Sequence, residues 1–179
     1  MVGENSELIE KFICSAESVV ATVEQIECTS EALNTALTRK TENEKNVLLT
    51  NPDDVDDNLF SLFRENKKVI TKPTLGELNT IKTGIVDAFC GVAETGSVCV
   101  AVTRNLSSPI SMLTRNLIVV VKGNTIVSKP RDVFNEENLE GKGFNRSFSF
   151  ITGPSATADM GPLVRGVHGP GKLHIIVLD

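Results

Sequence analysis

The last third of the chain is organised around residues 147–178, SFSFITGPSATADMGPLVRGVHGPGKLHIIVL. Two short apolar runs, Ser147–Ile151 and Leu173–Leu178, have the length and composition of buried strands. The stretch between them, Ile151–Pro170, is rich in Gly, Pro and small hydroxyl residues. An irregular connection of this length inside a compact domain is usually functional. We therefore predict a binding loop held between two core strands.

The loop supplies groups that suit an anionic or carbonyl-bearing ligand. Gly153 and Gly169 allow the backbone to approach a ligand closely. Ser155 and Thr157 add hydroxyl groups, and Arg165 adds a planar fork of donors. We predict these five residues to be ligand contacts.

Two further residues of the loop are candidates for proton transfer. Asp159 could act as a base, orient a neighbour or cap a helix, and His168 is one of only two histidines in the chain. The alternative is a structural loop in which the aspartate caps a helix and the histidine packs. His174, flanked by apolar residues, is expected to pack in the core rather than to bind a ligand.

A second candidate group lies in the stretch Gly91–Val102, GVAETGSVCVAV. Glu94 precedes a predicted core strand and is a candidate base or nucleophile, and Thr95, Gly96 and Ser97 are candidate ligand contacts. The alternative for Glu94 is a turn residue that hydrogen-bonds to the backbone. Open α/β sheets bind ligands at the carboxyl ends of their strands. We expect Glu94, Asp159 and His168 to converge there.

Helices and strands alternate in the first half of the chain. Helices are predicted at Ser6–Ser18, from the cap Thr29–Ser30, around Leu59–Phe63 and at Thr74–Asn79, and strands at Val19–Glu27, Val47–Thr50 and Lys68–Thr71. The alternation indicates an α/β fold with a largely parallel sheet covered by helices. We treat residues 1–179 as one domain, with an alternating half up to residue 80 and a motif-bearing half from residue 81.

Elements of the second half are less regular. Strands are predicted at Gly84–Ala88 and Asn116–Val121, and a helix at Asp132–Leu139. Asn105–Leu113 is expected to be a loop or a short helix broken at Pro109.

Charged residues are unevenly distributed along the chain. The formal net charge is −5, but residues 1–80 carry 15 acidic and 8 basic side chains, whereas residues 81–179 carry 8 and 10. The second half is therefore better suited to receive an anion. A nucleic-acid partner is disfavoured, because no basic cluster exists and Trp and Tyr are absent. Dinucleotide-binding and P-loop glycine motifs are also absent.

The remaining patterns concern cofactors and location. The spacing of the four cysteines, Cys14, Cys28, Cys90 and Cys99, matches no metal site. We therefore expect them to be reduced thiols, and we expect this chain alone to hold no metal and no cofactor. The sequence contains no run of 18 apolar residues and no signal-peptide pattern at its start. A cytoplasmic protein without a membrane span is expected.

Three motifs together resemble the LUD domain, the lactate-utilisation protein C family. They are AETGS at Ala93–Ser97, GPSATAD at Gly153–Asp159 and GVHGP at Gly166–Pro170. The positions that match the family pattern are Glu94, Thr95, Gly96, Gly153, Ser155, Thr157, Asp159 and His168. The chain departs from that pattern at Met160–Pro162, where an acidic residue is expected.

The resemblance implies a three-layer α/β fold similar to the ribose-phosphate isomerase, glucosamine-phosphate deaminase and CoA-transferase group. It also implies a part in oxidising lactate to pyruvate alongside two sister proteins, one of them an iron–sulfur carrier. The first functional hypothesis is therefore a subunit or accessory protein whose glycine-rich loop binds a small anion. The alternative is a stand-alone isomerase or acyl/CoA-transferase-type enzyme, with Glu94 as nucleophile or base and His168 as acid.

Overall fold

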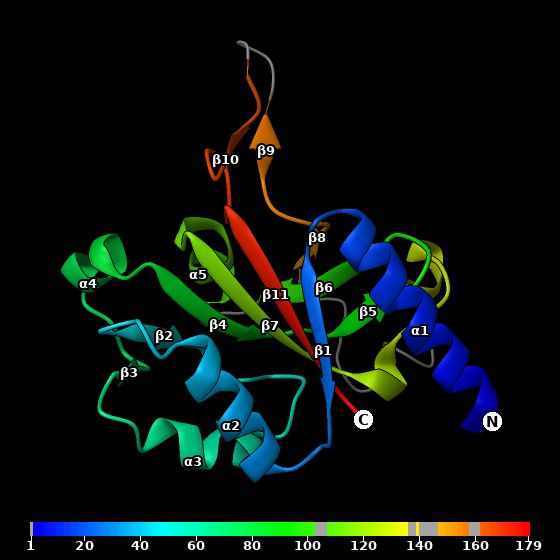
Figure 1. Cartoon of the computed structure of the whole chain (residues 1–179), viewed down its shortest axis with the longest axis horizontal. Coiled ribbons are helices and arrows are strands. Elements are labelled where there is room, and N and C mark those ends of the chain that lie inside the picture. The colour runs from blue at the N-terminus through cyan, green and yellow to red at the C-terminus, as the bar shows by residue number, and fades with distance from the viewer. Residues whose placement is uncertain (1, 103–106, 136–138, 140–146, 158–161) are drawn as a thin grey trace.

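A computed structural model describes residues 2–102, 107–135, 139, 147–157 and 162–179. Its centre is a six-stranded sheet in which every described pairing is parallel (Figure 1). In spatial order the strands are β1 (Thr22–Ile26), β11 (Lys172–Leu178), β7 (Asn116–Lys122), β4 (Thr83–Asp87), β2 (Val47–Leu49) and β3 (Val69–Ile70). The predicted parallel sheet is confirmed.

The register places the first residues of the strands side by side. Thr22 lies opposite His174, and Asn116 lies between Lys172 and Thr83. Strands β7 and β11 are buried over most of their length, as expected for parallel strands covered on both faces. All the amino ends of the sheet therefore lie along one edge.

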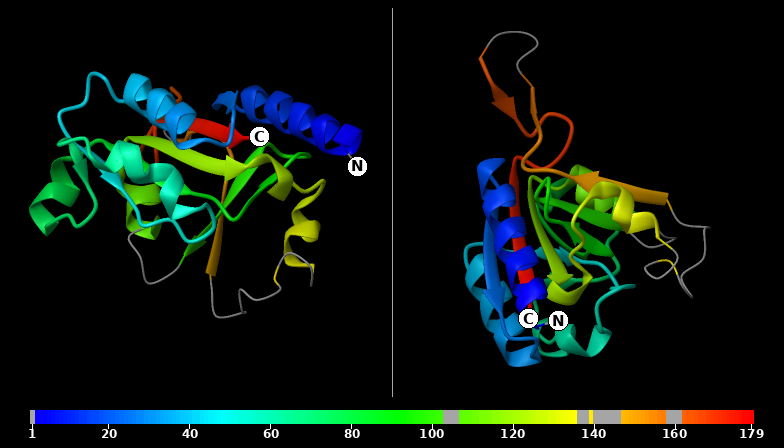
Figure 2. Two further views of the ribbon diagram at one scale, coloured as in Figure 1. Left: turned by 90° about the horizontal axis from the view of Figure 1, so that it is seen from below. Right: turned by 90° about the vertical axis from the view of Figure 1, so that its right-hand side faces the viewer.

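Helices and a second sheet cover the two faces of the parallel sheet (Figure 2). Helix α2 (Ser30–Lys40), capped by Thr29, packs on one face with η1 (Asp57–Phe60) and α3 (Ser61–Arg64). Helices α1 (Val2–Ser18) and α5 (Ser107–Leu113) pack on the other. The short helix α4 (Leu75–Thr80) has a complete capping box at Thr74 and Glu77. These layers agree with the three-layer α/β prediction.

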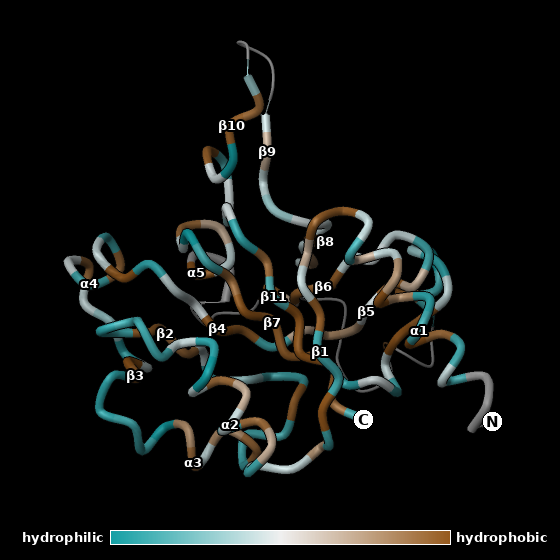
Figure 3. Tube along the Cα trace, in the orientation of Figure 1, coloured by the Kyte–Doolittle hydropathy of each residue, from teal (hydrophilic) through white to brown (hydrophobic). Residues whose placement is uncertain are grey.

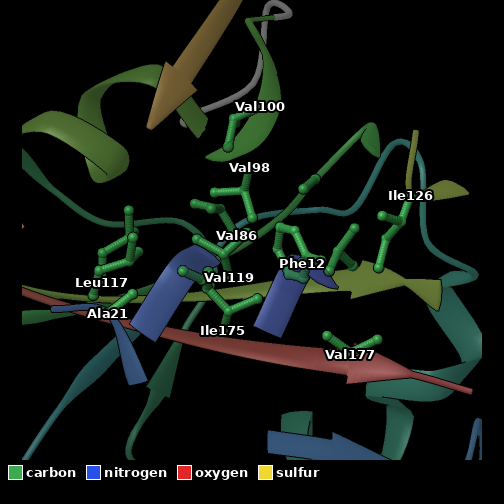
Figure 4. Close-up of a cluster of buried hydrophobic side chains, with 14 of the residues drawn as sticks. Phe12, Ala21, Val86, Val98, Val100, Leu117, Val119, Ile126, Ile175 and Val177 are labelled. Carbon is green, nitrogen blue, oxygen red and sulfur yellow. The ribbon is translucent and has the colours of Figure 1, made fainter. Parts of the chain in front are cut away.

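The second sheet is antiparallel and consists of β5 (Cys90–Val92), β6 (Ser97–Val102) and β8 (Ser147–Ile151), in that order. Val98 and Val100 of β6 contribute to the same core as Phe12 of α1 and Ile175 of β11 (Figure 4). The motif-bearing half is thereby joined to the parallel sheet by a continuous apolar core.

The predicted binding loop contains structure of its own. Strands β9 (Ala156–Thr157) and β10 (Val164–Arg165) form a short antiparallel hairpin. The hairpin projects beyond the amino end of β11 in two perpendicular views (Figures 1 and 2). Its side chains are largely exposed, so it is anchored to the domain mainly at its base.

Two local predictions are refined by the structure. The helix predicted at Asp132–Leu139 begins within the 3-10 turn η3 (Pro130–Phe134), and residues 136–138 lie outside the described part. The Asp132 carboxylate accepts a hydrogen bond from the Lys129 amide and closes this short turn. Helix α5 runs through Pro109, because a proline in the first helical turn removes no intrahelical hydrogen bond. A further 3-10 turn, η2 (Gly123–Thr125), follows β7.

No helix in the described part of the chain is both long and apolar enough to cross a bilayer.

Two motif glycines lie against the end of α1. Gly96 has a φ of 63°, and a Cβ at this position would lie 2.2 Å from the Ala16 amide nitrogen. Gly153 has a φ of 65°, and its Cβ would lie 2.2 Å from the Val19 carbonyl oxygen. Because both obstacles are backbone atoms, these glycines allow the motif turns to pack directly on the helix.

We predict that Gly96→Ala destabilises the protein by about 2 kcal/mol or more, because it combines positive-φ strain with a backbone clash. The melting temperature should then fall by about 4–8 °C. Gly76→Ala on the exposed face of α4 is the matched control and should stabilise by about 0.5–1 kcal/mol. Equal, small effects of the two substitutions would contradict the packing role of Gly96.

Candidate functional site

A cavity of about 420 Å³ lies at the amino ends of the parallel strands, on the face covered by α2. Its walls come from the starts of β1, β11, β7 and β4, from the end of α2 and the turn after it, and from the predicted loop. The lining residues that carry chemistry are Thr22, Lys40, Glu44, Thr83, Asn116, Arg165, Lys172 and His174.

Polar side chains line part of the cavity because each strand begins with a polar residue on this face and continues with apolar ones. On the α2 face, Thr83 is followed two residues later by Ile85, and Asn116 by Ile118. His174 is followed in the same way by Ile176. Alternate residues share a face, so each strand carries a polar side chain near its amino end and apolar ones beyond it. Figure 3 shows this change of hydropathy along β7 and β11.

Three polar side chains of β1 and β11 form a connected chain of hydrogen bonds. The His174 Nδ1 atom lies 2.7 Å from Thr22 Oγ1, and its Nε2 atom lies 2.8 Å from Glu24 Oε1. Arg39 of α2 forms an ion pair with the other oxygen of Glu24. His174 is only 8% exposed. The ring is thus held at both nitrogens and has its orientation fixed.

The chemistry of the partners determines where the ring protons lie. Burial alone would raise the pKa of Glu24, but the hydrogen bond with His174 and the charges of His174, Arg39 and Lys40 outweigh it, so the net shift is downward. Burial, with the charges of Lys40 and Arg39, lowers the pKa of His174 despite its bond to Glu24. The lowered pKa of His174 favours the uncharged imidazole at neutral pH. An ionised carboxylate can only accept, so Nε2 carries the proton and Nδ1 accepts from the Thr22 hydroxyl.

A second polar cluster forms the opposite wall of the cavity. The Thr83 hydroxyl donates to Glu44 Oε1 at 2.8 Å, and Asn116 Nδ2 lies 3.3 Å from the same oxygen. Asn116 Nδ2 also lies 3.1 Å from Thr83 Oγ1. These bonds hold the Glu44 carboxylate toward the cavity, where it can accept from a ligand hydroxyl or amine.

Three positively charged residues line the cavity, each from a different element: Lys40 at the end of α2, Lys172 at the start of β11 and Arg165 in β10. Val20 also lines the cavity, with a φ of 69° that a β-branched residue rarely adopts. This left-handed conformation closes the end of α1, where the Ala21 amide donates to the Ala16 carbonyl at 3.1 Å. The arrangement suits an anionic ligand that also offers a hydrogen-bond donor to Glu44.

Two of the predicted proton-transfer residues, Glu94 and His168, lie outside the cavity. Glu94 is exposed in the turn between β5 and β6, and its amide donates to the Ser128 carbonyl at 3.0 Å. His168 is exposed and follows β10. Neither residue lines the cavity. Asp159 lies outside the described residues.

The predicted contact residues fall into two groups. Thr95 and Ser97 join in a chain of hydroxyls to Thr152, with 2.7 Å between Thr95 Oγ1 and Ser97 Oγ and 2.7 Å between Ser97 Oγ and Thr152 Oγ1. The motif glycines Gly96 and Gly153 pack beside them on α1. This group links two of the three motifs but does not line the cavity.

The other group forms the base of the hairpin. The Ser155 amide donates to the Pro170 carbonyl at 2.8 Å, and the Gly166 amide donates to the Ser155 carbonyl at 2.9 Å. Gly169 lies close to the Ser155 side chain, and Thr157 lies in β9 opposite Val164. These contacts position Arg165, the predicted contact residue that reaches the cavity.

We expected Glu94, Asp159 and His168 to converge at the carboxyl ends of the strands, but the loop that contains His168 lies at the opposite edge. The loop leads into β11, so it arrives at the amino end of that strand, and every other strand of the sheet is parallel to β11. The prediction also missed Thr22, Glu24, Glu44 and His174. The signal was present, because a polar residue stands near the amino end of each long parallel strand.

Loops occupy the carboxyl edge near β4. Asp87, at the end of β4, accepts three backbone hydrogen bonds through Oδ2, from the amides of Asp53, Asp54 and Val55 at 2.7–3.1 Å. Burial is the main cause of its raised pKa, against the lowering effect of those bonds. The Asp87 carboxylate therefore has a structural role, because it holds the loop after β2 that contains Asp53 and Asp54. Across the described ranges, no three His, Cys, Asp or Glu residues are grouped to hold a metal ion.

The buried His174 makes the stability of the protein depend on pH. A lowered folded pKa means that the unfolded chain binds the proton more tightly, so stability falls as pH drops from 6.5 toward the folded pKa of His174. Glu24 adds a further loss at more acid pH, below 4.5. We predict that the melting temperature of the wild type falls between pH 7 and pH 5 more steeply than that of His174→Gln. Identical slopes would show that His174 is not held neutral.

The chain matches the family model of the LUD domain over residues 9–178. It is 31% identical over 119 residues to lactate utilization protein C of Shouchella clausii, a match that covers 65% of this chain and 50% of the relative. It is 32% identical over 101 residues to lactate utilization protein C of Bacillus subtilis, covering 54% and 42%. The chain therefore matches about half the length of these relatives.

A crystal structure of a DUF162 family protein from Deinococcus radiodurans has the same fold. The two structures superpose with a TM-score of 0.70 over 98% of each chain, at 17% sequence identity. The family model covers nearly the whole chain, and the resemblance carried by the three glycine-containing motifs is thereby confirmed. The chain belongs to the LUD domain family.

Proposed function

We propose that this chain takes part in lactate utilisation and that its cavity binds a small anionic ligand, a carboxylate or a phosphate ester. The names of its relatives support the pathway. The observation that carries the ligand proposal is the convergence of Lys40, Lys172 and Arg165 on one cavity. Arg165 is the link to the family motifs, because it belongs to the loop that contains two of them.

Size and charge narrow the ligand class. The cavity has a volume of about 420 Å³. A three-carbon acid fills only part of this space, so a larger anion, or an acid together with a second molecule, fits it better. Arg165 offers a planar fork to a carboxylate or phosphate, and Glu44 accepts from a hydroxyl group.

Partners belong to the same proposal. A lactate-oxidising role requires an electron acceptor, and we propose that an iron–sulfur sister protein supplies it. The hairpin that contains Arg165 offers such a partner an apolar surface. Leu163 and Val167, on either side of Arg165 in the sequence, are each more than half exposed. A cytoplasmic location fits this proposal.

Ligand binding is tested by thermal shift against lactate, pyruvate, inorganic phosphate, sugar phosphates, flavin nucleotides and CoA esters. An anion at about a hundred times its dissociation constant should stabilise the wild type by about 2.7 kcal/mol, which is a shift of about 5–10 °C. Arg165→Gln should lose most of this shift while its own melting temperature stays within about 1 °C, because the side chain is exposed.

Arg131→Gln is the matched control, because Arg131 is 79% exposed and lies outside the cavity. It should retain the full shift. If no anion shifts the wild type, the ligand proposal is wrong for the isolated chain. If Arg165→Gln and Arg131→Gln lose the shift equally, the anion binds through general surface charge and not in the cavity.

A further inference from the structure

Thr22 presents a hydroxyl group with an unusual set of neighbours. The residue is exposed at the start of β1 and lines the cavity, so a ligand can reach it. Its Oγ1 atom is 2.7 Å from His174 Nδ1, and the second ring nitrogen of His174 is 2.8 Å from Glu24. This order of contacts is typical of an activated nucleophile: a hydroxyl contacts a neutral imidazole, and a carboxylate orients the imidazole.

The direction of the hydrogen bonds favours activation. Because Nε2 donates to the Glu24 carboxylate, Nδ1 presents a lone pair to the Thr22 hydroxyl. The Leu173 carbonyl lies 3.4 Å from Thr22 Oγ1 and is the more distant of the two acceptors. The shorter contact favours the imidazole as acceptor of the hydroxyl proton, which is the arrangement that deprotonation requires.

The surroundings hold the imidazole in place. Arg39 pairs with Glu24 from α2, and Lys40 faces the same wall of the cavity. If the imidazole gains a proton, the resulting imidazolium remains paired with Glu24, so the carboxylate stabilises the charge that forms. A histidine that only filled space would need neither the half-buried carboxylate of Glu24 nor a reachable hydroxyl.

We propose that Thr22, His174 and Glu24 form a nucleophile–base–carboxylate triad that transfers acyl groups from anionic esters or thioesters bound in the cavity. Thr22 is the catalytic nucleophile, His174 is the base that acts on it, and Glu24 is a positioning residue. This inference rests on the proposal that the cavity binds anions, and it adds an activity to it.

The reaction proceeds in two balanced steps. Thr22 Oγ1 attacks the acyl carbonyl carbon while its proton passes to His174 Nδ1, and the bond from that carbon to the leaving oxygen or sulfur breaks. The leaving group departs with the proton from His174, and an acyl ester of Thr22 remains. Water then attacks this ester and gives a proton to His174, which returns it to the Thr22 oxygen as a carboxylic acid is released. Lys40, Lys172 and Arg165 are the cavity groups available to stabilise the oxyanion.

The experiment treats the full chain with p-nitrophenyl acetate and with acetyl-CoA, quenches in acid and maps acetylation by peptide mass spectrometry. An acetyl ester on Thr22 is removed by hydroxylamine, whereas acetyl-lysine is not. We expect hydroxylamine-sensitive acetylation at Thr22 in the wild type. Thr22→Val should abolish it without lowering the melting temperature, because valine keeps the β-branched shape at an exposed position.

Further variants separate catalysis from structure. Thr22→Ser should still be acylated at position 22, because serine keeps the nucleophilic oxygen. His174→Gln and Glu24→Gln should reduce the acylation rate by about 10²-fold or more. Thr35→Val is the control and should leave the rate unchanged, because it removes an exposed hydroxyl of α2 that donates to the backbone and lies outside the cavity.

The pH dependence of the acylation rate separates a catalytic role of His174 from a purely structural one. In the wild type the acylation rate should fall on acidification as His174 is protonated. The charged groups that face the ring are Glu24, Arg39 and Lys40. The residual rate of His174→Gln should lack this fall.

The outcomes distinguish this inference from the binding proposal. If anions shift the melting temperature through Arg165 but Thr22 is never acylated, the triad is wrong and the cavity is a binding site only. If Thr22 is acylated although no anion shifts the protein, the triad stands and the anion proposal fails. Equal acylation of the wild type and His174→Gln would show ordinary surface reactivity and overturn the triad.

Discussion

The parallel direction of six strands is the constraint on which the rest of the structure depends. Because no described strand of the central sheet reverses, every loop that leads into a strand meets the others at one edge. The glycine-rich stretch before β11 must therefore arrive beside the starts of β1, β7 and β4. Strand direction thus brings Arg165 to the same cavity as Thr22, Asn116 and His174.

The two edges of the sheet differ in how their polar groups are used. Near the carboxyl end of β4, the Asp87 carboxylate accepts hydrogen bonds from three backbone amides of the loop after β2. This carboxylate therefore has a structural role. At the amino edge, Glu44 and His174 are held by neighbours yet still border open space. Polar groups that are fixed in orientation but reachable are the ones that can bind or react. This contrast favours the amino edge as the functional one.

Sequence reasoning predicted the sheet and its helices because apolar runs such as NLIVVV at Asn116–Val121 indicate buried strands without tertiary information. It singled out the loop and Arg165, but it could not place Glu94, since a lone carboxylate in a turn looks the same whether it faces a cavity or solvent. His174 was read as a core residue because its sequence neighbours are apolar. Its partners Thr22 and Glu24 lie about 150 residues away, and only strand pairing brings them together.

We propose that ligands bind at the amino edge of the parallel sheet. The most direct test of this proposal is amide chemical-shift mapping of the ¹⁵N-labelled protein titrated with pyruvate and with inorganic phosphate. Binding at this edge should give saturable shifts at Thr22, Asn116, Leu173 and Arg165 and leave Asp87 and Glu94 unchanged. Shifts centred on Glu94 or on the carboxyl edge around Asp87 would contradict it and would return the functional site to the edge where open α/β sheets usually carry it.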